Sequence, residues 1–279
     1  MSTPITNRLA AIATVLAAFA AVAGLLIPGL YRDTPYWIQQ ARGTDLATLL
    51  AAVPALALGL WAARGASAAG QLAVFAGLLY IVYNYGIFVF AVVMNPLTAV
   101  HIAIVGVALW SLVLMTRDAS LTEAGAAIAA GLNRRASGVL LIAVAALFSL
   151  LWIAQIATTA MTGVLAADLI KAGLSTNPVY ALDLAFFLPL CAVAGIGLLR
   201  RTAVGAYGQP MLVWVALMGA GVVGGFLFSA AAGEEVPVVV AVVIGALSLA
   251  SAALASVPIL GRASRALTLK VPRPAHQGR

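Results

Sequence analysis

Charged residues are scarce in this sequence. Only 8% of its 279 residues are Asp, Glu, Lys or Arg, whereas 64% are hydrophobic, and the mean hydropathy is +1.10. A soluble domain carries about 25% charged residues, so this chain lacks the polar surface that would keep it in water. Lipid tolerates such a surface if the backbone polar groups are satisfied within the protein. The composition therefore excludes an ordinary soluble domain.

Cysteine and histidine are nearly absent. Cys191 is the only cysteine, so no disulfide can form within the chain, and two histidines and one cysteine do not make a Cys/His zinc cluster. The sequence also lacks a Walker-type loop and the motifs GxGxxG, GxSxG and HExxH. We therefore expect no metal and no cofactor, and the lack of a nucleophile–base pair disfavours an enzyme.

Acidic residues are fewer than basic ones, which gives a net charge of +7. The cations lie in short loops and in the tail, beside hydrophobic runs, and do not form one cluster. This distribution fits the excess of Lys and Arg that membrane proteins carry on their cytoplasmic side. The lipid bilayer is therefore an expected partner, and nucleic acid is not.

Hydrophobic runs of about twenty residues dominate what remains. They lack the polar–apolar alternation of barrel strands, so the sequence predicts an all-α, polytopic membrane helix bundle of about eight transmembrane helices. The first run exceeds the roughly 7–15 residues of a signal-peptide core, and we expect it to be a retained helix. The predicted spans are about 8–30, 46–63, 71–94, 97–115, 138–163, 179–199, 210–231 and 236–260.

The charges predict an orientation. With the N-terminus inside, twelve of the fifteen Lys and Arg residues lie on the cytoplasmic side, and six of the eight acidic residues lie outside. A wrong number of helices would mix these charges. We therefore expect a multi-pass protein of the bacterial cytoplasmic membrane with both termini in the cytoplasm.

The two halves of the chain have a similar layout. Asp33 and Pro54 in the first half correspond to Asp168 and Pro189 in the second, each pair 135 residues apart. Four spans per half predict two parallel four-helix repeats, and chance similarity in an Ala-rich chain is the alternative. The predicted parts are a first half (1–117), a cytoplasmic linker (118–137), a second half (138–260) and a basic cytoplasmic tail (261–279).

The linker and the tail carry their own signals. Ser120 and Glu123 match a capping box, which predicts a short interfacial helix over about 121–132. The tail has five cations and two prolines. We expect it to be disordered and to lie near anionic lipid headgroups, although control of topology alone also explains its charge.

Mid-helix prolines are the first candidate for a functional site. Pro54 and Pro189 lie midway along corresponding spans, and each frees the carbonyl four residues earlier, those of Leu50 and Ala185. Broken spans at matching positions of two repeats point to a transporter site. The alternative is a simple kink, because proline is common in membrane helices.

Polar side chains at membrane depth are the second candidate. Tyr83 and Asn84 lie in the third span, and Gln155 and Thr159 lie on a polar stripe of the fifth. Unpaired amides in hydrocarbon are costly, so Asn84 and Gln155 should face the bundle interior. They either form hydrogen bonds between helices or line one polar cavity.

Acidic residues in the outer half are the third candidate. They can bind a cation or relay protons together with His101, or they can be solvated helix caps. In the second interpretation Thr44 caps the second span with Asp45 as its first residue, and Asn177 caps the sixth span. The residues considered for ion or proton coupling are Asp33, Asp45, His101, Asp168 and Asp183.

Two segments carry a resemblance to known sequences. They run from Tyr31-Arg32-Asp33 to Thr44-Asp45 and from Asn177-Pro178 to Leu182-Asp183. With these segments the chain resembles multi-pass membrane proteins of high-GC bacteria whose function is unknown. The resemblance implies a topology and no particular activity.

Transport of a small solute or ion is the leading functional hypothesis, with a substrate site between the two halves at Pro54, Tyr83, Asn84, Gln155, Thr159 and Pro189. One alternative is a non-catalytic subunit, assembly factor or sensor that binds another membrane protein through the small-residue faces of spans one and seven. The other is an intramembrane enzyme that acts on a lipid or a quinone.

Overall fold

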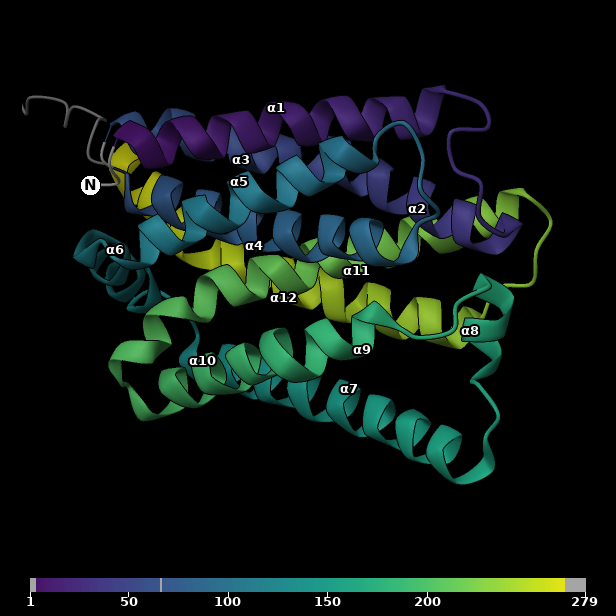
Figure 1. Ribbon diagram of the computed structural model, residues 1–279. Helices are drawn as coiled ribbons and strands as arrows, with labels where there is room; N and C mark the ends of the chain where they lie inside the picture. Colours follow the sequence, from purple (N-terminus) through teal and green to yellow (C-terminus); the bar gives the residue numbers. More distant parts are fainter. Residues whose placement is uncertain (1–3, 66, 269–279) are drawn as a thin grey trace, which may run out of the picture.

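The computed structural model describes residues 4–65 and 67–268, and the regular secondary structure of this part is helical throughout (Figure 1). The first half contains α1 (Pro4–Leu26), α2 (Pro35–Ala47), the π-helical turn η1 (Thr48–Ala52), α3 (Val53–Arg64), α4 (Ala68–Ala91) and α5 (Thr98–Thr116). The helix α6 (Ala119–Ala129) connects it to the second half. That half contains α7 (Arg134–Thr162), α8 (Ala167–Ala172), α9 (Pro178–Leu182), the π-helical turn η2 (Asp183–Phe187), α10 (Leu188–Arg200), the 3-10 turn η3 (Ala203–Tyr207), α11 (Gly208–Ala231) and α12 (Val238–Thr268).

Eight helical segments of the described part are long and apolar enough to cross a membrane. They are Ile5–Leu26, Pro35–Arg64, Ala68–Ala91, Thr98–Thr116, Arg134–Thr162, Pro178–Arg200, Ala203–Ala231 and Val238–Pro258. Large apolar side chains are exposed on their outer faces, where lipid replaces water. The chain is therefore an integral membrane protein, and the predicted all-α polytopic bundle of eight spans is confirmed.

The second span begins earlier than the sequence predicted. Thr34 is the N-cap and accepts a hydrogen bond from the backbone N–H of Trp37 at 3.3 Å, and Pro35 occupies the first helical position. The prediction that Thr44 caps this span is wrong. Asp45 lies eleven residues into a 30-residue segment, because an interior polar face gave residues 35–45 the composition of a loop.

The helix termini gather at two ends of the bundle. In Figure 1 the N-terminus and α6 lie at one end, which we call the basic end, and α8 lies at the other, the acidic end. The residues that give the ends these names are Arg64, Arg117, Arg134 and Arg200, against Asp33, Asp168, Glu234 and Glu235. Which end faces the cytoplasm stays a prediction from the charges.

Glycines let α2 and α11 pack with their backbones in contact. A Cβ atom at Gly43 would overlap the backbone of Gly224 and Gly225, and one at Gly221 would lie 2.9 Å from the Thr44 side chain. The alanine face of α1 is likewise buried within the chain. These small-residue faces of spans one and seven are therefore occupied by neighbouring helices of the same chain.

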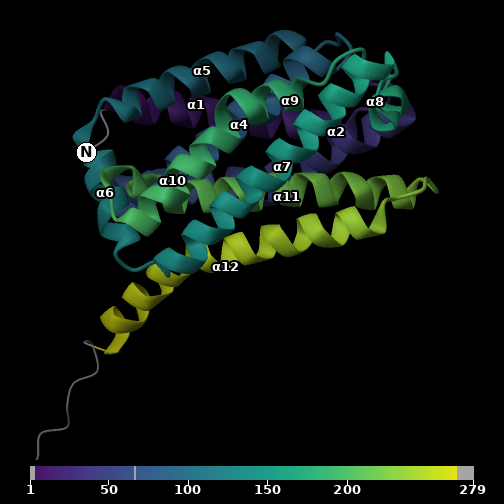
Figure 2. The same cartoon turned by 90° about the horizontal axis from the view of Figure 1, so that it is seen from below.

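The two halves differ in how tightly their helices pack against one another. In the first half α1, α3, α4 and α5 pack against one another in turn. In the second half α7 packs closely on α10 and α11 on α12, whereas α7 meets α11 and α12 only weakly. Figure 2 shows α7 close to α12 near one end and diverging from it toward α8. The second half is thus split into two helix pairs.

The linker and the last helix differ in detail from expectation. Asp118, and not Ser120, caps α6, because its Oδ1 accepts the Ser120 N–H at 2.9 Å. The face of α6 with Leu121 and Ile128 is buried on the end of the bundle. The helix α12 continues to Thr268, so the first part of the expected tail is helical. The remainder, 269–279, lies outside the described residues.

Candidate functional site

A cleft of about 510 Å³ opens among α2, α4, α7, α9, α11 and α12. Its walls come from both halves of the chain: Tyr83 and Asn84 from the first, and Trp152, Gln155 and Asp183 from the second. Its lining runs from Asp168 at the acidic end to Val144 of α7 and Ile244 of α12 inside the membrane-spanning part. Its volume is within the roughly 300–1,000 Å³ of small-molecule sites.

Asp183 provides the charge of the cleft. Tyr83 Oη donates to Asp183 Oδ1 at 2.8 Å, and Trp152 Nε1 donates to Asp183 Oδ2 at 2.7 Å. Both carboxyl oxygens therefore accept hydrogen bonds, which is the pattern of an ionised carboxylate. Its two donors are neutral, so they orient the carboxylate and leave its charge uncompensated.

Asn84 lines the same cleft as Asp183, and its amide makes no hydrogen bond. The residue is 1% exposed, and neither its Oδ1 nor its Nδ2 has a hydrogen-bond partner. It lies seven residues before the end of α4, about 10 Å along the helix axis, so the amide is inside the spanning part. A buried polar group without a partner costs about 1–3 kcal/mol, which a bound ligand can recover. Asn84 is thus the strongest sign that the cleft binds something.

Aromatic rings form most of the remaining wall. Trp214 stacks on Phe187 with the centroids 4.8 Å apart, and its Nε1 has no hydrogen-bond partner. Gln155 accepts a hydrogen bond from the hydroxyl of Tyr180, so this amide is held in place. The aromatic residues that line the cleft are Tyr36, Trp37, Tyr83, Phe88, Phe148, Trp152, Trp214 and Phe226.

The cleft contains half of the predicted substrate site. Tyr83, Asn84 and Gln155 line it, as a polar cavity between the halves required. Pro54, Thr159 and Pro189 do not line it. Both prolines are exposed on the outer surface of the bundle, and the bond that each removes is one within its own helix.

The prolines act through the backbone. Pro54 and Pro189 are each the second residue of an α-helix that follows a five-residue π-helical turn, at η1 and η2. In these turns the N–H of Val53 bonds to the carbonyl of Thr48 and that of Leu188 to Asp183, five residues back. The two π-helical turns are 135 residues apart, like the prolines. The π-helical turn η2 begins at Asp183 itself.

Asp45 belongs to a different site. It is 0% exposed and points toward α1, where Tyr31 Oη donates to its Oδ2 at 2.6 Å and Gly24 leaves room for both groups. Its Oδ1 has no hydrogen-bond partner. Burial first, and then the negative Asp45, raise the pKa of Tyr31, so this hydroxyl stays a donor. A solvated cap at Asp45 is therefore excluded.

Of the other predicted coupling residues, one lies in the cleft and two lie in neither site. Asp168 lines the cleft with Asp183. His101 is 1% exposed and packs on Tyr85 and Phe88, outside the cleft. Asp33 Oδ1 accepts the Val93 N–H at 2.9 Å, and burial raises the pKa of Asp33. The five residues do not form one cluster.

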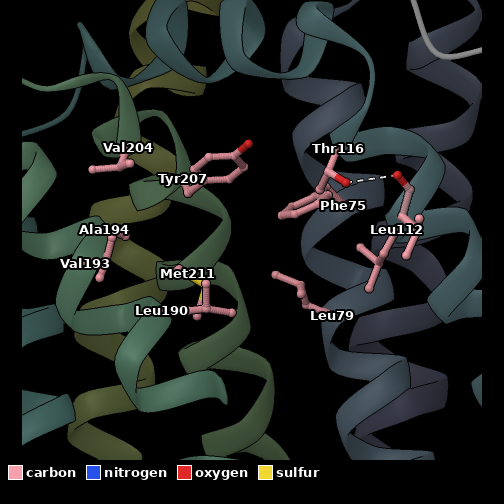
Figure 3. A pocket seen from close by; sticks show the side chains of 11 residues that line it. Phe75, Leu79, Leu112, Thr116, Leu190, Val193, Ala194, Val204, Tyr207 and Met211 are labelled. Atoms are coloured by element: carbon pink, nitrogen blue, oxygen red, sulfur yellow. Dashed lines mark hydrogen bonds between the residues drawn. The ribbon is translucent and has the colours of Figure 1, made fainter. Parts of the chain in front are cut away.

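A second, apolar pocket of about 340 Å³ lies between α4 and α5 on one side and α10, η3 and α11 on the other. Figure 3 shows Phe75, Leu79 and Leu112 facing Leu190 and Met211 across it. It lies nearer the basic end than the cleft does, because it includes Thr116 and Val204 beside the loops of that end. The α7–α10 pair is therefore flanked by one cavity toward each end.

Sequence reasoning missed Trp214, Tyr180 and Tyr31, although aromatic residues with a polar atom inside apolar spans are a usable signal. The described residues bring together no group of three His, Cys, Asp or Glu side chains that could hold a metal ion. The fold and the cleft define a multi-pass membrane protein with a ligand-sized cavity between its halves. Comparison of the chain with protein-family models, curated proteins and solved structures finds no match.

Proposed function

We propose that the protein transports a small solute across the membrane and binds it in the cleft between the halves. The observation that carries this proposal is the buried, unpartnered amide of Asn84 in the same cleft as the hydrogen-bonded carboxylate of Asp183. A group inside a membrane whose polar atoms have no partner is a functional-site indication in itself. The proposed location is the bacterial cytoplasmic membrane, with the basic end in the cytoplasm.

The split second half supports transport over simple binding. The pair α7–α10 has a cavity on each side, the cleft toward the acidic end and the apolar pocket toward the basic end. Rocking of one helix pair against the remaining helices closes one cavity as it opens the other, which is the usual geometry of alternating access. Two parallel repeats, as the paired π-helical turns suggest, are part of this proposal.

The two alternatives have less support. A subunit role was expected to use small-residue faces on spans one and seven, but these faces pack within the chain. An intramembrane enzyme would need acidic residues and His101 in one pocket, and of the five residues considered for coupling only Asp168 and Asp183 line the cleft. The subunit role also leaves the amide of Asn84 unexplained.

Reconstituted flux tests the proposal. Proteoliposomes and protein-free liposomes are compared for uptake of cationic, neutral and anionic organic solutes, with wild type and Asn84→Leu. Gln209→Leu is the matched control, because Gln209 is also a buried amide with an unpartnered atom but does not line the cleft. Transport predicts a flux that Asn84→Leu abolishes and Gln209→Leu keeps. Equal flux in all three proteins, or none for any charge class, contradicts it.

A further inference from the structure

Resting on the proposed transport site, we infer that the ligand of the cleft is a hydrophobic organic cation. The first argument is charge. Apart from tyrosine, the ionisable residues that line the cleft are Asp168 and Asp183, and among the described residues no Lys, Arg or His lines it. An anion would meet a carboxylate without any positive partner, whereas a cation would supply the missing charge.

Two cations lie on helices that contribute to the cleft wall, Lys171 on α8 and Arg42 on α2, and both have partners elsewhere. Lys171 Nζ lies 3.8 Å from Glu234 Oε2, and the guanidinium of Arg42 lies 5.3 Å above the ring of Phe228 and donates to the Leu25 carbonyl at 3.2 Å. Neither side chain compensates Asp183, because that carboxylate has only the neutral donors Tyr83 and Trp152. The negative charge of the cleft therefore stays available to a ligand.

The second argument is the aromatic wall. A cation is attracted to the face of an aromatic ring, most strongly to Trp and more so where water is excluded. The chain itself uses this interaction at the rim, where Lys171 Nζ lies 4.4 Å from the ring centroid of Tyr36, a residue of the cleft wall. Trp152 donates to Asp183, and the ring of Trp214 packs on Tyr83, the other donor to this carboxylate. Both indoles line the cleft, so a cation bound near Asp183 can meet a carboxylate and aromatic rings.

The third argument is size and polarity. The cleft has a volume of about 510 Å³ and apolar residues on α7 and α12. These properties suit a drug-sized lipophilic ion and not a hydrated metal ion. The described residues offer no cluster of three ligating side chains for a metal. Asn84 offers one carbonyl oxygen and one NH2 group without partners. The other amide and aliphatic hydroxyl side chains in the lining already hydrogen-bond within the protein, which leaves too few free groups for a sugar with many hydroxyls; they are Gln40, Thr44, Gln155, Asn177 and Ser248. The combination selects a lipophilic cation with at most one or two polar groups.

Two ions of nearly the same shape and opposite charge test the inference. Purified protein in zwitterionic nanodiscs is titrated with tetraphenylphosphonium and with tetraphenylborate, and binding to empty nanodiscs is subtracted. We expect saturable binding of the phosphonium. The borate should bind at least about tenfold more weakly, so that its Kd is about tenfold higher or more. Equal or tighter binding of the borate, or no saturable phosphonium binding, overturns the inference without any variant.

A variant then tests whether the carboxylate of Asp183 is the charge that attracts the phosphonium. Asp183→Asn should weaken phosphonium binding about tenfold or more, whereas Glu123→Gln, which removes an exposed acid of α6 outside the cleft, should leave it unchanged. Equal loss in both variants contradicts a role for the cleft carboxylate. Uptake of phosphonium by proteoliposomes separates the two proposals. Saturable binding without uptake refutes transport and keeps the ligand class. Uptake of only neutral or anionic solutes keeps transport and refutes a cationic ligand.

Discussion

Asp45 and Asp183 are two buried carboxylates with different surroundings. Asp45 faces α1, receives one hydrogen bond from Tyr31 and is enclosed by a helix whose glycine allows the contact. Asp183 faces a cavity and receives two hydrogen bonds. The first is a packed interior group, and the second is the group that we propose to contact a ligand. Single substitutions should separate these roles.

Gly24→Ala should destabilise the fold. A Cβ at this position would overlap the carboxylate of Asp45 and the hydroxyl of Tyr31, so the hydrogen bond between them has to break or the helices have to move apart. Overpacking of this kind costs about 1–3 kcal/mol. Thermal unfolding in detergent measures the loss. Gly106→Ala is the control, since a Cβ there meets nothing within 4 Å, and an equal loss in both variants would contradict the explanation.

The elements show which features the sequence could reveal. Eight spans, short loops and sorted charges follow from composition, so the bundle was predictable. Asn84 and Gln155 were predicted to face inward because amides avoid lipid, and both line the cleft. Whether a polar residue is a cap or an interior group depends on which helix covers it. Local sequence does not contain this information, and the interpretation of Asp45 as a solvated cap residue was therefore wrong.

The π-helical turn η2 sets the direction of Asp183. Pro189→Ala restores an N–H on the outer surface of the bundle, which favours α-helical hydrogen bonding in place of the π-helical turn and rotates residues on its N-terminal side. We expect Asp183 to lose its bonds to Tyr83 and Trp152. Binding of tetraphenylphosphonium should fall several-fold, while thermal stability stays the same or rises, because proline inside a helix costs up to about 3 kcal/mol.

Pro54→Ala is the control for this prediction. It makes the same change at the corresponding π-helical turn η1, which precedes an exposed proline in the first half and does not contain a residue of the cleft wall. Its phosphonium binding should be unchanged. If both variants lose binding equally, the π-helical turn at Asp183 has no special role in the site.

At the scale of the whole molecule, the eight spans of the described residues are an even number, so the two ends of the described chain should lie on one side of the membrane. The charges predict that this side is the cytoplasm. Glu123→Cys on the basic end and Glu235→Cys on the acidic end, each in a Cys191→Ala background, report the orientation. A membrane-impermeant maleimide should label only the Glu235 variant in intact cells. The opposite labelling pattern would invert the topology.

The divergence of α7 from α12 makes the α7–α10 pair the part of the molecule that can move as a unit. Ligand between Trp152 and Trp214 would draw α7 toward α11 and α12, because it contacts both sides of the cleft. Spin labels at Met161 on α7 and Val239 on α12, both highly exposed, should therefore approach by more than about 2 Å when tetraphenylphosphonium is added. Pulsed electron–electron double resonance measures this distance.

A second label pair shows whether the movement is confined to the α7–α10 pair. Phe90 at the end of α4 is exposed like Met161, but α4 packs firmly against α3, α5 and α11. The distance between labels at Phe90 and Val239 should stay constant when the ligand binds. Closure of the cleft by the α7–α10 pair requires that only the first distance shortens. Two constant distances would mean a rigid binding site, and transport by rocking of this helix pair would then have to be abandoned.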